Sequence, residues 1–351
     1  MKVLVAGVDG YIGSMLAPML IKEGHTVVGI DAGYYREGWL YSDQASLAHL
    51  PATSNKDIRD ITLEDLDGVD AVVHLAELSN DPLGENNPEI THAINHKGSV
   101  RLANLAKELG IERFVYTSSC SVYGVSDADF VDETSAVDPQ TAYAECKVLV
   151  EQDVSKLADD NFSPSFLRNA TAYGASPRMR FDIVLNNLAG LAWTSKNIAM
   201  TSDGTPWRPL VHVLDICAAI SSALTAPREI VHDQIFNVGS SKANYTVRQI
   251  AEIVASHFPG CETTFGPAGG DNRSYRVSFD KIENTLESYE AKWDADAGAA
   301  QLYELFNRID MTRDVFEFRA YTRLKQLEYL LRTSQLDEEF FWRAPPSTAV
   351  R

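Results

Sequence analysis

A glycine-rich segment near the N-terminus constrains the fold of this chain more than any other feature. Gly7, Gly10 and Gly13 are each separated by two residues, and they lie between an apolar run, Val3–Ala6, and a helical pattern, Ile12–Glu23. In such a segment the first glycine permits a tight turn, the second lets the backbone approach a pyrophosphate, and the third allows close helix packing. The N-terminus of the helix then faces the phosphates. The segment therefore predicts a dinucleotide-binding turn of an α/β fold, with an ordinary structural turn as the alternative.

Short β-branched runs alternate with helical patterns over the first 120 residues. Further runs lie at Thr26–Ile30, Ala71–Leu75 and Arg113–Thr117, and further helical patterns at Ile90–Leu109 and Thr141–Asp159. This alternation indicates βαβ units with parallel strands. We expect an α/β protein with a Rossmann-type doubly wound parallel sheet and a smaller, discontinuous C-terminal substrate-binding lobe.

Proline and glycine interrupt the chain after about Leu167, where the second lobe is expected to begin. Leu210–Thr225 still reads as a strand followed by a helix, which indicates a return to the first domain. We assign residues 1–170 and about 208–238 to the dinucleotide domain, and about 171–207 and 239–345 to the substrate lobe. The amphipathic stretch Arg319–Phe341 predicts a terminal helix, followed by a frayed tail from Ala344.

The composition argues against several classes of function. A net charge of −18 repels nucleic acid and anionic lipid surfaces, so neither is an expected partner. No run approaches the roughly 18 apolar residues that span a bilayer, and no signal peptide is evident. The four cysteines form no close pair, which favours a reducing, cytoplasmic location. The histidines show no metal-ligand spacing, so no metal site is expected.

Asp31 ends the second predicted strand, eighteen residues after Gly13. A carboxylate there can accept hydrogen bonds from the adenosine ribose hydroxyls and would repel a 2′-phosphate. This favours NAD over NADP, although Arg36 lies close enough to leave NADP as an alternative. Asp57 and Ile58, after the third strand, are placed to flank the adenine, and an ordinary loop carboxylate is the alternative for Asp57.

A serine and a tyrosine–lysine pair follow the fourth clear strand. Ser119 lies in the segment TSSCSVYG at the carboxyl edge of the sheet, and Tyr143 and Lys147 lie in YAECK, twenty-four residues further on. Positions i and i+4 share one face of a helix. A lysine ammonium favours the phenolate, which lowers the pKa of a tyrosine toward working pH. Tyr143 is therefore a candidate general base and acid.

Taken in order, the glycine segment, Asp31, the serine-bearing strand and the Tyr143–Lys147 helix resemble the extended short-chain dehydrogenase/reductase superfamily, in its nucleotide-sugar epimerase/dehydratase branch. The resemblance implies that Ser119 hydrogen-bonds the substrate oxygen, Tyr143 transfers its proton, and Lys147 holds the nicotinamide ribose. It also implies an NAD cofactor, a nucleotide-diphosphate sugar as substrate, and a homodimer formed through Ile90–Leu109 and Thr141–Asp159. The expected cofactor residues are Gly7, Gly10, Tyr11, Ile12, Gly13, Asp31, Asp57, Ile58, Leu75, Ala76, Tyr143 and Lys147. The expected substrate residues are Ser79, Ser119, Cys120, Ser121, Asn169, Asn187, Arg208 and Arg273, with Arg276 as the alternative to Arg273.

The two residues after Ser119 discriminate among reactions of this family. Its 4,6-dehydratases carry Asp-Glu there, its decarboxylases carry a glutamate at the second position, and its 3,5-epimerases carry a cysteine at the second position. This chain has Cys120 and Ser121. The pattern is most similar to the 4-epimerases, which oxidise a sugar hydroxyl and re-reduce the ketone from the opposite face. The alternatives are a dehydratase or keto-sugar reductase of the same fold, or a dinucleotide-binding sensor or scaffold without enzymatic activity.

Overall fold

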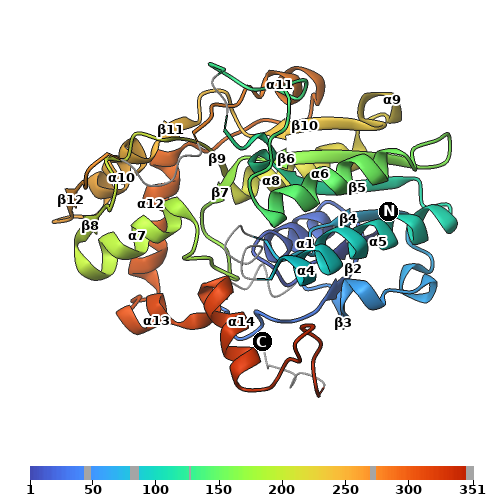
Figure 1. The fold of residues 1–351 in the computed structure, drawn as a ribbon, viewed down its shortest axis with the longest axis horizontal. Helices are drawn as coiled ribbons and strands as arrows, with labels where there is room; N and C mark the ends of the chain where they lie inside the picture. Colours follow the sequence, from blue (N-terminus) through green and yellow to red (C-terminus); the bar gives the residue numbers. More distant parts are fainter. Residues whose placement is uncertain (43–48, 80–86, 126–127, 269–273, 345–351) are drawn as a thin grey trace.

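The computed structural model describes residues 1–42, 49–79, 87–125, 128–268 and 274–344, and its centre is a seven-stranded parallel sheet. The strand order is β10-β6-β5-β4-β1-β2-β3 (Figure 1). From β1 the chain forms β2 and then β3 on one side of β1, and it then crosses over to form β4 on the other side of β1. The direction in which strands are added to the sheet therefore reverses between β1 and β4. Ligands of open α/β sheets bind outside the carboxyl ends of the strands at such a point. The strands are β1 (Lys2–Ala6), β2 (Thr26–Asp31), β3 (Ala52–Asn55), β4 (Ala71–His74), β5 (Arg113–Ser119), β6 (Ser163–Asn169) and β10 (Gln234–Val238).

Helices cover both faces of the sheet, because its strands are apolar on both sides. In β1, Val3 and Val5 belong to one buried cluster, and Leu4 and Ala6 belong to the other. The first cluster is completed by α1 (Gly13–Lys22) and α8 (Val213–Thr225), and the second by α5 (Ser99–Glu108) and α6 (Ala142–Ser155). Alternate side chains of a strand point to opposite faces, and a parallel sheet buries both. The predicted Rossmann-type sheet is confirmed.

The pattern predicted as one helix at Ile90–Leu109 contains three helical segments. These are α4 (Pro88–Thr91), a π-helical turn at His92–Gly98, and α5. The π turn packs against the 3₁₀ turn Ile58–Asp60, where a Cβ on Gly98 would lie 3.0 Å from Cγ2 of Ile58. π turns often occur beside functional sites.

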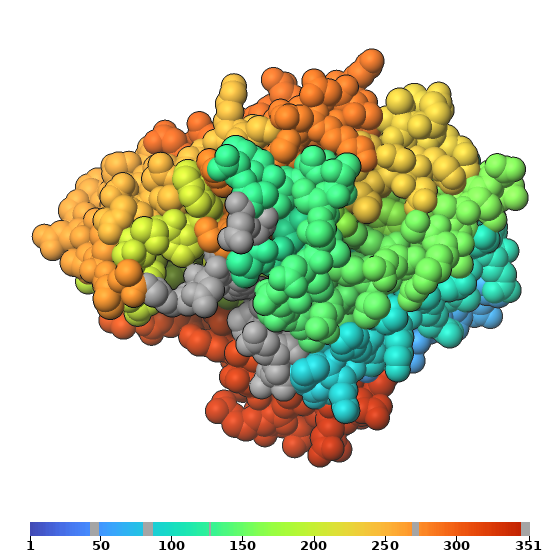
Figure 2. Space-filling view, turned by 45° about the horizontal axis from the view of Figure 1, so that its top comes forward, coloured from blue at the N-terminus to red at the C-terminus, as the bar shows by residue number. Residues whose placement is uncertain are grey.

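The second lobe packs α7, α10 and α12 together beside two small sheets, to the left of the main sheet in Figure 1, and its yellow-green and orange atoms form the left side of the surface in Figure 2. Strand β10 lies in the main sheet, so the chain re-enters that sheet after β9 and α8. No helix within the described ranges is long and apolar enough to cross a membrane. The elements are β7 (Thr171–Tyr173), α7 (Val184–Ser195), β8 (Asn197–Ala199), β9 (Trp207–His212), α9 (Arg228–Val231), β11 (Asn244–Thr246), α10 (Val247–His257), β12 (Glu262–Thr264), α11 (Asp280–Thr285), α12 (Ala295–Arg308) and α13 (Arg313–Glu317).

The terminal helix predicted at Arg319–Phe341 is wrong in its extent. A 3₁₀ turn covers Arg319–Tyr321, and α14 covers only Arg323–Arg332. The helix ends because Ser334 adopts a positive φ of 56° and the carboxylate of Asp337 accepts the amide N–H of Phe341, which forms a turn. The rest of the segment lies against the loop after β2. Of the predicted frayed tail, residues 345–351 lie outside the described residues.

Candidate active site

The glycine segment leaves room for a ligand at the N-terminus of α1. Gly7 has φ +88°, and a Cβ placed on it would lie 2.8 Å from the backbone nitrogen of Ala76. A Cβ on Gly13 would lie 2.2 Å from the carbonyl oxygen of Gly7. Within the described residues, no side chain caps the start of α1, and its first turn carries no acidic residue. An uncapped helix N-terminus of this kind is suited to phosphate groups.

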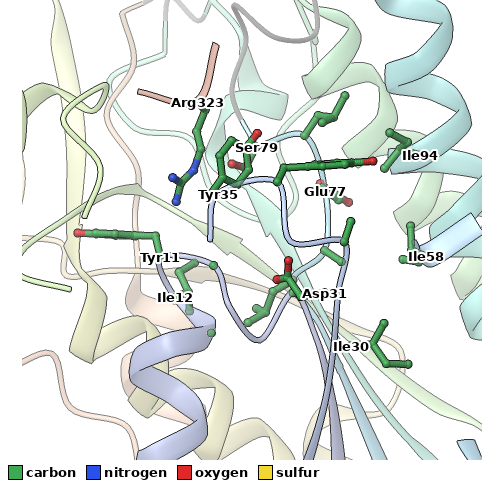
Figure 3. Close-up of a pocket in the computed structure, with 18 of the residues that line it drawn as sticks. Tyr11, Ile12, Ile30, Asp31, Tyr35, Ile58, Glu77, Ser79, Ile94 and Arg323 are labelled. Carbon is green, nitrogen blue, oxygen red and sulfur yellow. The ribbon is translucent and has the colours of Figure 1, made fainter. Parts of the chain in front are cut away.

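This segment forms one wall of a pocket with an empty volume of about 920 Å³ at the carboxyl ends of β1, β2 and β4 (Figure 3). Hydrophobic side chains and a few polar groups line it, as in most cofactor sites. The sequence-predicted residues that line it are Gly7, Gly10, Tyr11, Ile12, Gly13, Asp31, Asp57, Ile58, Leu75, Ala76 and Ser79. The lining residues that the sequence did not single out include Tyr34, Tyr35, Glu77, Leu78, Arg180 and Arg323.

Asp31 lies at the end of β2 in this pocket. Its carboxylate accepts the amide N–H of Gly33 at 2.7 Å and that of Asp9 at 3.1 Å, one on each oxygen. Burial and the neighbouring charge of Asp9 raise the pKa of Asp31. A carboxylate oxygen has two acceptor sites, so each oxygen can still accept a ribose hydroxyl. Arg36 bonds instead to the side chain of Asn55 and to the carbonyl of Gly33, which weakens the alternative of NADP.

The loop after β4 is fixed to the π-helical turn by Asn95. This buried side chain accepts the amide N–H of Leu78 at 2.8 Å and donates to the carbonyl of the same residue at 3.0 Å. The next residue, Ser79, receives bonds from Nη1 of Arg180 at 3.2 Å on both its hydroxyl and its carbonyl. Asn95 thereby holds one edge of the pocket in place.

Tyr143 and Lys147 lie one turn apart near the start of α6. The ammonium of Lys147 lies 5.4 Å from the ring centroid of Tyr143 and donates to the carbonyl of Thr117 at 2.5 Å. Neither residue lines the pocket described above, but Lys147 contacts Glu77, which does.

Glu77 is a buried carboxylate that the sequence did not single out. Its Oε2 lies 2.5 Å from Nζ of Lys147, and its Oε1 accepts the phenol of Tyr116 at 2.6 Å. The two charged side chains are only 3% and 5% exposed. Burial lowers the pKa of Lys147, but the charges of Glu77 and Tyr143 outweigh burial and raise it above its usual value. Lys147 is therefore a fixed, charged group beside Tyr143.

Ser119 is the last residue of β5 and lies beside Asn169 in the register with β6. Its hydroxyl accepts the amide N–H of Ser121 at 3.1 Å. Within the described part of the chain, Oγ of Ser121 and Oδ1 of Asn169 are buried without a hydrogen-bond partner. Unpaired buried polar atoms cost free energy, so these atoms are candidate contacts for a polar substrate.

Cys120 points away from this edge. It is 1% exposed, its thiol donates to the carbonyl of Arg168 at 3.2 Å, and burial raises its pKa. A thiol in this environment packs as a small apolar group and is a poor proton donor at neutral pH.

Asn187, Arg208 and Arg276 do not line this pocket. Asn187 on α7 donates to the carbonyl of Phe181 at 2.9 Å, and Arg208 on β9 donates to the carbonyl of Trp207 at 2.8 Å. Arg273 lies outside the described residues. Its alternative, Arg276, pairs with Asp129 at 2.8 Å. Across the part of the chain that the structure describes, no cluster of three potential metal ligands occurs.

Comparison with known proteins identifies the family to which this geometry belongs. Residues 3–239 match the model of the NAD dependent epimerase/dehydratase family. The chain belongs to this family. Its cofactor is NAD, and the glycine segment, the carboxylate of Asp31 and the pocket that they line fit that dinucleotide.

Curated relatives and solved structures include both epimerases and dehydratases. Protein CapI of Staphylococcus aureus is 30% identical over 242 residues, which cover 65% of this chain and 70% of CapI. UDP-glucose 4-epimerase of Mycolicibacterium smegmatis is 28% identical over 300 residues, covering 82% and 92%. MoeE5 in complex with UDP-glucuronic acid and NAD superimposes with a TM-score of 0.74 at 26% identity, covering 88% and 99%. The NDP-hexosamine 5,6-dehydratase TunA has the same fold, with a TM-score of 0.76 at 21% identity over 88% of this chain and 99% of its own.

Proposed function

We propose that this protein is an NAD-dependent nucleotide-sugar epimerase that inverts the C4 carbon through a transient keto-sugar. The observation that carries the proposal is the buried Lys147 beside Tyr143, together with Cys120 and Ser121 after the catalytic serine. This chain lacks an acid–base pair at the two positions where dehydratases of the family carry one. The 4-epimerases among its relatives support the same reaction.

In the proposed mechanism Tyr143 acts as the base that removes the proton of the C4 hydroxyl. Lys147 stabilises the phenolate, and Glu77 holds the ammonium in place by its 2.5 Å ion pair. Ser119 donates a hydrogen bond to the sugar oxygen as it becomes a carbonyl. NAD would be held by Gly7, Gly10, Gly13 and Asp31, and it would supply the hydride chemistry that allows C4 to be oxidised and then reduced from the opposite face once the keto-sugar has turned. Tyr143 then gives the proton back, so the reaction has no net redox change.

We propose that the lobe built from residues 171–207 and 239–345 binds the nucleotide and that residues 1–170 and 208–238 hold NAD. Arg208 remains a proposed ligand of a substrate phosphate, since it lies on β9 where the two parts of the chain meet. A homodimer formed through the faces of α5 and α6, and a cytoplasmic location, are further parts of this proposal.

A panel of UDP-, dTDP- and GDP-sugars, incubated with purified protein in D₂O without added cofactor, tests the reaction. We expect one sugar to be converted to its C4 epimer, with no solvent deuterium in the product and no lasting absorbance at 340 nm. Tyr143→Phe is expected to lower kcat by about 10²–10⁴-fold. Tyr303→Phe, which removes a phenol on α12 in the other lobe, serves as the control.

Other products would show that the protein catalyses a different reaction. Deuterium at C5 with loss of water would identify a dehydratase, and stoichiometric consumption of NADH would identify a reductase. An unchanged rate in Tyr143→Phe would refute the mechanism.

A further inference from the structure

Two buried arginines from distant parts of the chain meet in the cofactor pocket. Arg180 precedes α7 and Arg323 begins α14, and both line the pocket together with Tyr11 and Ile12 of the glycine segment. Figure 3 shows the guanidinium of Arg323 pointing into the pocket, toward the loop that carries Tyr11 and Ile12. The C-terminal segment therefore contributes a positive charge to a pocket built by the N-terminal sheet.

The guanidinium of Arg323 has few partners for a group that is only 2% exposed. Among the described residues its one hydrogen bond is from Nη1 to the carbonyl of Ala320, at a long 3.4 Å, and its Cζ lies 4.1 Å from the ring centroid of Tyr35. A guanidinium has five N–H donors. The hydroxyl of Tyr35, in the same pocket, is also buried without a partner among the described residues. Both side chains therefore have N–H or O–H groups available to donate to a further hydrogen-bond acceptor.

Among the described residues, the two guanidiniums differ in their contacts with the nearby carboxylate of Asp182. Arg180 forms a bidentate pair with Asp182, at 2.8 and 3.2 Å. The same carboxylate accepts the backbone N–H of Arg323 at 3.1 Å, and among the described residues no hydrogen bond joins it to the guanidinium of Arg323. Burial and the charge of Arg180 lower the pKa of Arg323 to about 10, which still leaves it charged at neutral pH. A buried unpaired charge is costly, so a bound anion would stabilise this arrangement.

We propose that Arg323 and Arg180 bind the diphosphate of NAD from the side opposite the glycine segment, so that α14 closes the cofactor pocket. The inference rests on the NAD cofactor of the family and deepens the proposed function, because an epimerase must keep its cofactor through both hydride transfers. The N-terminus of α1 contacts one side of the diphosphate, and the two guanidiniums contact the other. The pairing of planar guanidinium groups with phosphate oxygens is bidentate and charge-assisted.

The C-terminal segment is fastened to the loop after β2, which also borders the pocket. Nε1 of Trp342 donates to the carbonyl of Ala32 at 2.7 Å, and the phenol of Tyr34 donates to the carbonyl of Phe340 at 2.8 Å. Gln326 on α14 donates to the carbonyl of Tyr34 at 3.1 Å. Figure 1 shows α14 beside the edge of the sheet that ends in β3. Release of NAD then requires these bonds to open.

The test compares Arg323→Gln with Lys325→Gln, which removes an exposed charge from the same helix. We would measure the NAD retained on purification, the NAD dissociation rate, and the Kd values of NAD, ADP, adenosine and UDP. For Arg323→Gln we expect about 10- to 100-fold weaker binding of NAD and ADP and a correspondingly faster release, with adenosine unchanged. Lys325→Gln is expected to match the parent protein.

Arg323→Met, which fills the same space without donors, is a second variant with the same expectation. Because either change removes an under-bonded buried charge, we expect the melting temperature without NAD to stay level or rise, while the NAD-induced increase shrinks. NAD and ADP affinities within 2-fold of the parent would overturn the proposal. An equal loss for adenosine would indicate a general distortion, and weaker binding of UDP alone would assign Arg323 to the substrate; either result also overturns it. These measurements use no sugar turnover, so they are independent of whether the protein is an epimerase.

Discussion

Gly13→Ala is predicted to weaken the binding of NAD strongly while it lowers the stability of the fold only slightly. The added Cβ would lie 2.2 Å from the carbonyl oxygen of Gly7 and 2.6 Å from that of Val8. Both neighbours are backbone atoms, so no side chain can rotate away. Relief requires α1 to move by about 1 Å from the loop, at a cost of roughly 1–3 kcal/mol for overpacking. For a chain of this length that corresponds to a melting temperature lower by about 1–4 °C.

The same movement takes the N-terminus of α1 away from the NAD diphosphate. We therefore expect the Kd for NAD, measured by isothermal titration calorimetry, to rise at least about 10-fold, since each charge-assisted bond contributes roughly 1.5–3 kcal/mol. Gly24→Ala is the matched control. Gly24 lies just beyond the other end of α1, has φ +91° and has nothing within 4 Å of its Cβ position. That variant should lose about 1 kcal/mol of stability through backbone strain and keep its NAD affinity. Normal NAD binding by Gly13→Ala would refute the reasoning.

Three further changes test other parts of the structure. Glu77→Gln leaves the buried ammonium of Lys147 without its counter-charge, so the free energy of unfolding in urea should fall by about 3–5 kcal/mol, and additional Lys147→Met should restore part of it. Burial lowers the pKa of His212 to about 4, whereas an unfolded chain protonates histidine near 6.5. Stability should therefore fall as pH drops from about 6.5 toward 4, by up to about 3 kcal/mol, and His212→Gln should flatten that part of a melting-temperature series. Cys120→Ala should keep kcat/KM within about 3-fold, because the thiol points to the carbonyl of Arg168; a loss of 100-fold would make it a proton donor.

The parts of the site that could be predicted are those encoded by local patterns. Three local patterns are of this kind: the glycine spacing, the acidic end of β2 and the i, i+4 pair on α6. In each of them the arrangement of the residues is set within one turn or one strand. The sheet could be predicted for the same reason, since alternating strands and helices admit few topologies. Spacing along the sequence predicted Gly7 and Asp31 for this site, the family resemblance added Ala76, and all three line one pocket.

Residues whose role depends on distant contacts could not be found in this way. Arg323 is separated from Asp31 by nearly the whole chain, and its stretch has the amphipathic pattern of an ordinary surface helix. Glu77 follows β4, where the sequence alone does not distinguish it from an ordinary loop carboxylate. Its role becomes visible only from its burial and from its ion pair with Lys147. Arg180 lies in the range 171–207 that the sequence analysis assigned to the substrate lobe, and only the fold shows that it lines the cofactor pocket.

The central claim is that the C4 hydride leaves the sugar and returns to it within one enzyme molecule. The most direct test is a nucleotide sugar carrying deuterium at C4, converted by purified protein without added NAD and analysed by mass spectrometry and NMR. We expect a C4 epimer that keeps its deuterium, with no deuterated NADH in solution. Deuterium found in free NADH, or lost to solvent, would contradict it.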